Sequence, residues 1–146
     1  MDQAIQDFIN GKRIAVVGVS RDKEKFGNTA FTELAARGYQ VFAVHPTAQE
    51  IGGAPCYPNL TALRGQVDGA LVVVSSGQAA PVLREAAAIG LRNVWLQQGA
   101  ESPEVLALAR DLELNLVAKK CVLMYALPVR SFHAWHRFFA RLFGQF

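Results

Sequence analysis

The chain has 146 residues, of which 51% are hydrophobic and 18% are charged, a composition that fits one packed domain and excludes a disordered chain. The net charge of +3 is too small to indicate a polyanion-binding protein, and no apolar stretch approaches the roughly 20 residues of a membrane span. Because the N-terminus lacks a signal-peptide pattern and Cys56 and Cys121 stand outside any C-x-x-C pair, we expect a cytoplasmic protein with reduced thiols.

Apolar runs that alternate with helical patterns predict an α/β domain. Five runs read as strands, at residues 13–18, 40–44, 67–74, 93–96 and 114–118. Most are continuous and do not alternate, which is typical of strands buried on both faces of a parallel sheet. Helical patterns occur at residues 28–37, at residues 81–89 and from Ser102 onward. We therefore expect a doubly wound parallel sheet of about five to six strands with flanking helices.

Two further segments complete the predicted organisation. Residues 51–60 are rich in Gly and Pro, and we expect a loop there with at most a short edge strand. No repeat, low-complexity tract or linker divides the chain, so we interpret residues 1–146 as a single domain with a core at about residues 10–125. An extra amphipathic helix is predicted at about residues 131–144, where aromatic and aliphatic side chains share one stripe.

The predicted C-terminal helix has three interpretations. It packs on the sheet, it contacts a second copy of the chain or another protein, or it lies on a membrane surface. The modest length and few lysines favour packing. His133 and His136 are three residues apart and could face a metal together with Cys121, but histidines beside an aromatic stripe usually pack there. We expect no metal site.

The passage that follows the first strand is the strongest functional signal. The apolar run Ile14 to Val17 leads into Gly18 and Ser20, then a basic loop, and then Gly27 at the start of a helix. A buried strand that ends in small residues before a helix is a common way to hold a phosphate. The two glycines are nine residues apart, which differs from the G-x-G-x-x-G turn of NAD-binding proteins. The sequence therefore predicts a nucleotide, but not NAD bound in the usual way.

The residues after the other strands refine this prediction. Ligands of doubly wound sheets bind beyond the carboxyl ends of the strands, and here those ends carry small, hydroxyl, amide or basic groups and no carboxylate. An NAD site needs an acid after the second strand, whereas this chain has His45 and Pro46. Lys119 and Lys120 follow the last strand and are expected to add positive charge at the cleft. These features suit a ligand with several phosphates.

Several segments together resemble a known family, the small stand-alone CoA-binding proteins, which are similar to the CoA-binding domain of the succinyl-CoA synthetase α subunit. The resemblance is carried by residues 14–27, 38–46, 53–60, 67–68, 94–99 and 119–121. It covers about residues 10–125 and implies a Rossmann-like fold whose cleft takes the ADP part of coenzyme A or an acyl-CoA. The synthetase's phosphohistidine belongs to a second domain that has no counterpart in this sequence. The resemblance therefore implies binding and no reaction.

The resemblance also implies which residues bind the ligand. Gly18, Val19 and Ser20 would approach the pyrophosphate, and Arg21, Lys25, Gly27 and Asn28 would close the loop and the helix start over it. Val44, His45 and Pro46 would lie beside the adenosine, and the family's usual residue at the position of His45 is Asn. Val74, Ser75 and Ser76 would line the adenine or pantetheine side, and Gln97 would face the cleft. No catalytic residue and no metal ligand is implied.

Two functions remain open. The first is a binding module for CoA or an acyl-CoA, which the missing acid–base pair favours over an enzyme. The second is an oxidoreductase or transferase that uses NAD, NADP or another adenine nucleotide. Nucleic acid is not expected as a partner, because no reading element is present. Cys121 follows two lysines and could form a mixed disulfide with CoA or simply be inert, whereas Cys56 is expected to pack.

Overall fold

The computed structural model describes residues 3–22 and 25–126. Seven strands are present in this part of the chain: β1 Arg13–Val17, β2 Gln40–Val44, β3 Glu50–Ile51, β4 Ala54–Tyr57, β5 Gly69–Val72, β6 Asn93–Gln97 and β7 Asn115–Lys120. The α-helices are α1 Gln3–Asn10, α2 Phe26–Ala36, α3 Ser76–Ala88 and α4 Pro103–Asp111. Two 3₁₀ turns follow β4 and β7, η1 Thr61–Leu63 and η2 Val122–Met124.

The strands form one sheet in the order β3-β4-β2-β1-β5-β6-β7, and only the pairing of β3 with β4 is antiparallel. The chain leaves β1 toward β2 on one side, and it later enters β5 on the other side of β1. The strand order therefore reverses at β1. In doubly wound sheets the crevice for a ligand lies at this reversal, outside the carboxyl ends of the strands.

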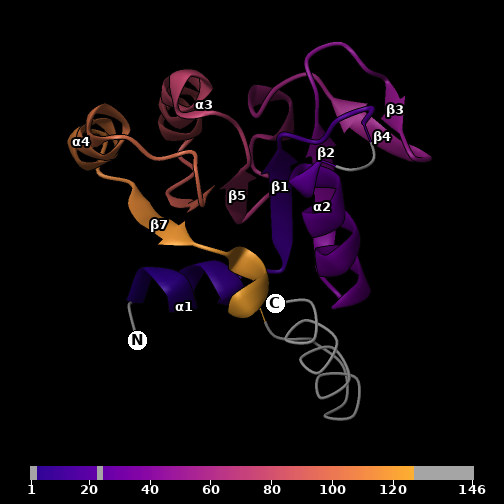
Figure 1. The fold of residues 1–146 in the computed structure, drawn as a ribbon, viewed down its shortest axis with the longest axis horizontal. Coiled ribbons are helices and arrows are strands. Elements are labelled where there is room, and N and C mark those ends of the chain that lie inside the picture. The colour runs from indigo at the N-terminus through magenta and orange to yellow at the C-terminus, as the bar shows by residue number, and fades with distance from the viewer. Residues whose placement is uncertain (1–2, 23–24, 127–146) are drawn as a thin grey trace.

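Helices cover both faces of the sheet (Figure 1). The face covered by α3 and α4 holds one buried cluster, which includes Val17, Val72 and Leu83. The opposite face, covered by α1, α2 and η2, holds a second cluster around Trp95 and Phe8, whose ring centroids are 5.3 Å apart. The central strands are buried on both faces, which explains their continuous apolar sequences.

The expected fold class is confirmed, and the strand count is slightly higher than predicted. Residues 51–60 contain more regular structure than a loop, because β4 adds to the edge of β2 and β3 pairs back onto it. Gly52 and Gly53 have φ of +57° and +83°, which allows the tight reversal between these two strands. Helix α1 was not predicted, and its buried face of Ala4, Ile5 and Phe8 packs in the second cluster.

Helix α3 begins five residues earlier than the sequence pattern indicates. Proline is common in the first turn of a helix, so the sequence favoured a helix that starts at Pro81. In the structure the helix starts at Ser76 and Pro81 lies inside it. The proline has no N–H for the carbonyl of Gly77, but Gly77 is exposed, so water can bind that carbonyl.

The predicted C-terminal helix at residues 131–144, with His133 and His136, lies outside the described residues. The described chain ends at Ala126, whose carbonyl accepts a 2.8 Å hydrogen bond from the buried guanidinium of Arg37 in the loop after α2. Across residues 3–22 and 25–126, no helix is both long and apolar enough to cross a membrane.

Candidate ligand site at the ends of the central strands

A cavity of about 750 Å³ lies at the carboxyl ends of β1, β2 and β5, where the strand order reverses. Its walls come from the loop between β1 and α2, the turn after β2, the segment after β4, and helix α3. The lining residues are Val17, Gly18, Val19, Ser20, Lys25, Phe26, Gly27, Val44, His45, Pro46, Pro58, Asn59, Val73, Val74, Ser75, Gln78, Val82 and Glu85. The structure thus brings ten of the fourteen predicted site residues to one cavity.

The two glycines of the loop are required by close backbone contacts. Gly18 has a φ of +126°, and a Cβ there would lie 2.0 Å from the carbonyl oxygen of Val73. A Cβ on Gly27 would lie 2.2 Å from the carbonyl oxygen of Gly18 itself. Gly18 and Gly27 are nine residues apart in the sequence but are in contact in the structure, because Gly27 at the start of α2 packs on the end of β1. This contact brings the N-terminal turn of α2 directly onto the loop.

Ser20 is fixed by its own loop and by α2. Its backbone N–H donates to the side-chain oxygen of Asn28, and the amide nitrogen of Asn28 donates to the Ser20 carbonyl, both at 2.7 Å. The Ser20 hydroxyl oxygen accepts from the backbone N–H of Asp22 at 3.0 Å, which leaves the hydroxyl proton available for a ligand. Lys25 is the N-cap of α2 and makes no side-chain cap. Lys25, Phe26 and Gly27 all line the cavity, so the N-terminal turn of α2, which carries the positive end of the helix dipole, borders it.

The turn after β2 contributes the side chain of His45. Its Nδ1 accepts hydrogen bonds from the backbone N–H groups of Thr47 at 3.2 Å and Ala48 at 2.9 Å. The His45 backbone N–H donates to the carbonyl of Tyr57 at 2.9 Å, which attaches this turn to β4. The imidazole is half-buried and lines the cavity.

Helix α3 supplies a wall that the sequence reasoning missed. Gln78, Val82 and Glu85 continue the helix face that begins at the predicted Ser75, the N-cap of α3, and this signal depends on knowing where α3 begins. Glu85 is a carboxylate in a cavity whose strand ends carry none. Its Oε1 accepts from the backbone N–H of Leu60 at 3.1 Å, and its Oε2 accepts from the N–H and hydroxyl of Thr61 at 3.3 and 2.8 Å.

Four predicted site residues lie outside this cavity. Arg21 and Asn28 line a second cavity of about 560 Å³ between α2 and the β3–β4 hairpin. Ser76 lies in a groove between α3 and α4. Gln97 is buried, and its side-chain oxygen accepts from the backbone N–H of Val122 at 3.1 Å, so it holds η2 against β6.

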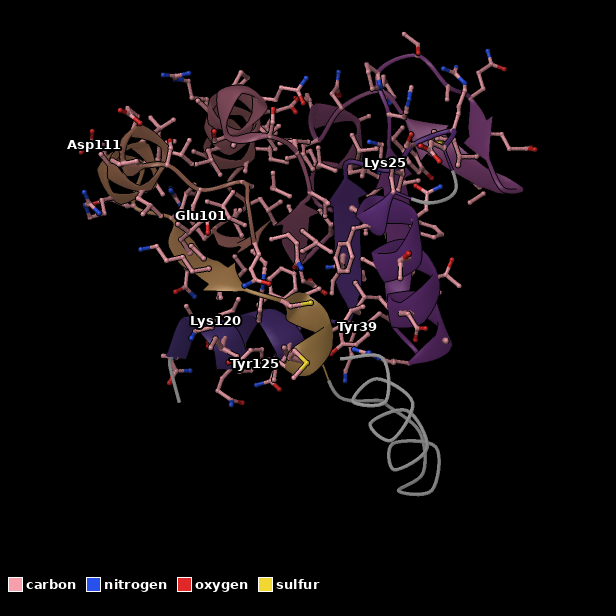
Figure 2. The ribbon with its side chains drawn as sticks, in the orientation of Figure 1. Lys25, Tyr39, Glu101, Asp111, Lys120 and Tyr125 are labelled. Atoms are coloured by element: carbon pink, nitrogen blue, oxygen red, sulfur yellow. The ribbon has the colours of Figure 1, made fainter. Side chains whose placement is uncertain are left out.

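The two lysines after the last strand are also far from the cavity. Strand β7 is at the opposite edge of the sheet from the hairpin, and Lys119 and Lys120 are exposed there. Figure 2 shows Lys120 beside Tyr125 and well separated from Lys25. The Lys120 ammonium lies 6.0 Å from the centre of the Tyr125 ring. The expectation that these lysines surround the cleft is therefore wrong.

Cys56 and Cys121 are both free thiols. Cys56 is half-buried in β4, and burial raises the pKa of its thiol, while the charge of Arg21 acts in the opposite direction. Cys121 is half-buried at the start of η2 and is also a free thiol. Within residues 3–22 and 25–126, no three His, Cys, Asp or Glu side chains lie together as metal ligands would.

Comparisons with known proteins agree with this architecture. The family model for the CoA binding domain matches residues 12–126. A solved structure, a conserved hypothetical protein from Pyrococcus furiosus, is 32% identical with a TM-score of 0.73, and the match covers 76% of this chain and 96% of that one.

Two curated relatives are much larger. The chain is 28% identical over 121 residues to acetate–CoA ligase (ADP-forming) I of Archaeoglobus fulgidus, a match that covers 76% of this chain and 18% of that protein. It is 27% identical over 126 residues to the α subunit of acetate–CoA ligase (ADP-forming) II of Pyrococcus furiosus, covering 79% of this chain and 28% of that protein. The chain therefore spans less than a third of the length of either relative.

Proposed function

The chain belongs to the CoA-binding domain family, and from that membership we propose that it binds coenzyme A or an acyl-CoA in the cavity at the ends of β1, β2 and β5. The ligases named above act on acetate and CoA by their names, but this chain corresponds to only a part of them. The proposal therefore covers ligand binding and leaves out their reaction.

The observation that carries the proposal is the loop from Gly18 to Gly27. Close contact between these glycines brings the backbone of Val19 and Ser20 and the first turn of α2 to one edge of the cavity. The N-terminal turn of α2, the Ser20 hydroxyl and the charge of Lys25 together suit a pyrophosphate. The cavity volume of about 750 Å³ lies within the range of small-molecule sites.

The other walls suit the adenosine. Val74 and Val82 offer apolar surface, and Gln78 offers an amide for the base edge. Glu85 comes from α3, on the sheet face opposite to α2, so its negative charge is on the other side of the sheet from the helix start that attracts phosphate. This separation orients the ligand with its pyrophosphate at the loop and its base toward α3.

The absence of an acid after β2 weighs against an NAD-dependent enzyme. His45 occupies the position where a carboxylate would accept hydrogen bonds from the ribose. The role of the chain is therefore proposed as a carrier, sensor or partner subunit for a CoA compound. Oxidoreductase or transferase chemistry with another adenine nucleotide is the competing function in the test below.

Isothermal titration calorimetry with CoA, NAD, NADP and ATP tests the proposal. We expect CoA to bind most tightly. Binding of NAD with no binding of CoA at millimolar concentration would reject the proposal and favour the competing function. The double variant Ser20→Ala with Lys25→Ala should weaken CoA binding, and Lys12→Ala, which removes one positive charge at the amino end of β1, should not. Mass spectrometry of the native protein would identify a ligand that co-purifies.

A further inference from the structure

The imidazole of His45 has a fixed proton position. Its Nδ1 accepts two backbone hydrogen bonds, from Thr47 at 3.2 Å and from Ala48 at 2.9 Å. A nitrogen that accepts from N–H groups presents its lone pair, so the ring proton of the neutral imidazole is on Nε2. Among the described residues, Nε2 has no hydrogen-bond partner, and the ring lines the cavity. His45 therefore offers one directed N–H donor to a ligand.

The two ring nitrogens have separable roles. Nδ1 closes the turn after β2 in the way that the side-chain oxygen of Asn or Asp closes an Asx turn. Nε2 takes no part in the turn. The backbone hydrogen bond from His45 to Tyr57 at 2.9 Å holds the main chain of His45 beside β4.

The location of His45 determines which part of the ligand it meets. In doubly wound sheets the residue at the end of the second strand lies beside the ribose of the adenosine, and its chemistry selects the ribose substituent. A carboxylate selects free hydroxyls, whereas a donor or a cation accommodates a phosphate. Arg21 lines the neighbouring cavity with Glu50 and Gly52 of the β3–β4 hairpin, so a guanidinium is also present near this part of the sheet.

We infer that His45 is a specificity-determining residue, whose Nε2–H donates to the phosphate on the ribose of coenzyme A and selects CoA over 3′-dephospho-CoA. The inference rests on the proposed function, because it assumes that adenosine binds beside β2. It goes beyond CoA binding by assigning the discrimination between the two ligands to one atom.

His45→Asp is the variant that separates the two roles of the ring. Aspartate can accept both turn hydrogen bonds, but it has no donor and adds a negative charge at the ribose. The affinity of the His45→Asp variant for CoA should fall by about ten- to a hundredfold, the range expected for a lost hydrogen bond to a charged group. Its affinity for 3′-dephospho-CoA should stay within about twofold or rise, and its thermal unfolding should stay close to that of the wild type.

Thr47→Asp is the matched control, because it adds the same charge two residues away, at an exposed position. Calorimetry with CoA and 3′-dephospho-CoA on all three proteins decides between the outcomes. A selective loss of CoA binding in His45→Asp alone supports the inference. Equal losses for both ligands, equal losses in both variants, or no loss would overturn it. A wild-type protein that binds neither ligand would instead reject the proposed function.

Should His45→Asp fail to fold, His45→Asn provides the second measurement. Asparagine keeps a turn acceptor, but its shorter side chain cannot place its NH₂ donor where Nε2–H of the imidazole lies. The wild type should bind CoA more tightly than 3′-dephospho-CoA, and this preference should be reduced at least fivefold in His45→Asn, within the range of a single hydrogen bond. An unchanged preference would overturn the inference.

Discussion

Asn28 and Ser20 are joined by two hydrogen bonds of 2.7 Å, one in each direction between the Asn28 side chain and the Ser20 backbone. Asn28 is in the first turn of α2, and Ser20 is in the loop after β1. The pair therefore joins Ser20 directly to the first turn of α2. Because Ser20 is already held by Asn28, little binding free energy is needed to position Ser20 for a ligand.

The first prediction concerns this pair. Asn28→Asp keeps the oxygen that accepts from Ser20 N–H but removes the amide that donates to the Ser20 carbonyl, and it adds a negative charge. We expect a loss of about 1–2 kcal/mol in the free energy of unfolding and weaker CoA binding. Urea unfolding and calorimetry measure the two effects. Thr29→Asp is the control, because it adds the charge one residue further along α2 and keeps the pair. Equal CoA binding in Asn28→Asp and the wild type would show that the pair is dispensable.

The second prediction concerns the contact between Gly27 and Gly18. Gly27→Ala would place a Cβ 2.2 Å from the Gly18 carbonyl oxygen, so α2 must move away from β1. We expect destabilisation of about 1–3 kcal/mol or more, together with loss of CoA binding, both measured on the same preparations.

Gly77→Ala is the matched control for Gly27→Ala. Gly77 is also in the first turn of a helix, and a Cβ there meets nothing within 4 Å. We expect this variant to be neutral or more stable by up to about 1 kcal/mol, because alanine is the better helix former. If both variants were equally stable, the close contact between Gly27 and Gly18 would make no difference to the free energy of unfolding.

The strength of sequence reasoning differed between parts of this chain. The continuous apolar runs predicted the central strands because parallel strands are buried on both faces, and this pattern needs no knowledge of distant residues. The spacing of Gly18 and Gly27 marked the loop, but their mutual contact was not predicted, because it depends on how α2 packs on β1. Helix α1 was missed because its apolar face is buried by a residue distant in the sequence, Trp95 of β6, which contacts Phe8.

The site predictions show the same limit. Gln97 and Lys120 both follow predicted strands, so both were expected at the cleft. The position of a strand end in the cleft depends on the lateral order of the strands, and β6 and β7 lie on the far side of β5 from β2. Glu85 was missed for the opposite reason, because it belongs to a helix and reaches the cavity through packing. The lateral order of the strands and the start of α3 are the two features that could not be predicted from this sequence.

The third prediction concerns Glu85 as the support of the wall formed by Pro58 and Asn59. Its carboxylate accepts hydrogen bonds from the buried Leu60 and from Thr61. In Glu85→Gln one oxygen becomes an NH₂ group and cannot accept, so at least one N–H loses its partner. We expect a loss of about 1–3 kcal/mol in the free energy of unfolding.

Thr61→Val provides a graded comparison for Glu85→Gln. It removes only the hydroxyl that donates to Glu85 at 2.8 Å and keeps both backbone hydrogen bonds. Its loss should be smaller than that of Glu85→Gln, and the double variant should lose less than the sum, because the two side chains share one interaction. Strict additivity in urea unfolding would contradict a direct role for this contact.

The fourth prediction concerns the pH dependence of stability, at the end of the sheet opposite to the cavity. Asp68 precedes β5, and its carboxylate accepts from the backbone N–H groups of Lys12 and Arg13 at 3.1 and 3.0 Å and from the Arg13 guanidinium at 2.8 Å. The hydrogen bond from Arg13 lowers the pKa of Asp68, while burial acts in the opposite direction. The same hydrogen bond raises the pKa of Arg13.

The sign of the effect follows from this shift. Because the pKa of Asp68 is lower in the folded than in the unfolded protein, its contribution to stability is fully present above the unfolded value near pH 4. The contribution is lost as the pH falls through the folded pKa. Asp68→Asn removes the titrating group. We therefore expect the wild type to exceed this variant in free energy of unfolding at pH 7 and pH 5, with the gap narrowing below about pH 4. Urea unfolding across this pH range measures the gap, and a gap that stays constant down to pH 3 would show that the ionised carboxylate is not what holds β1 to β5.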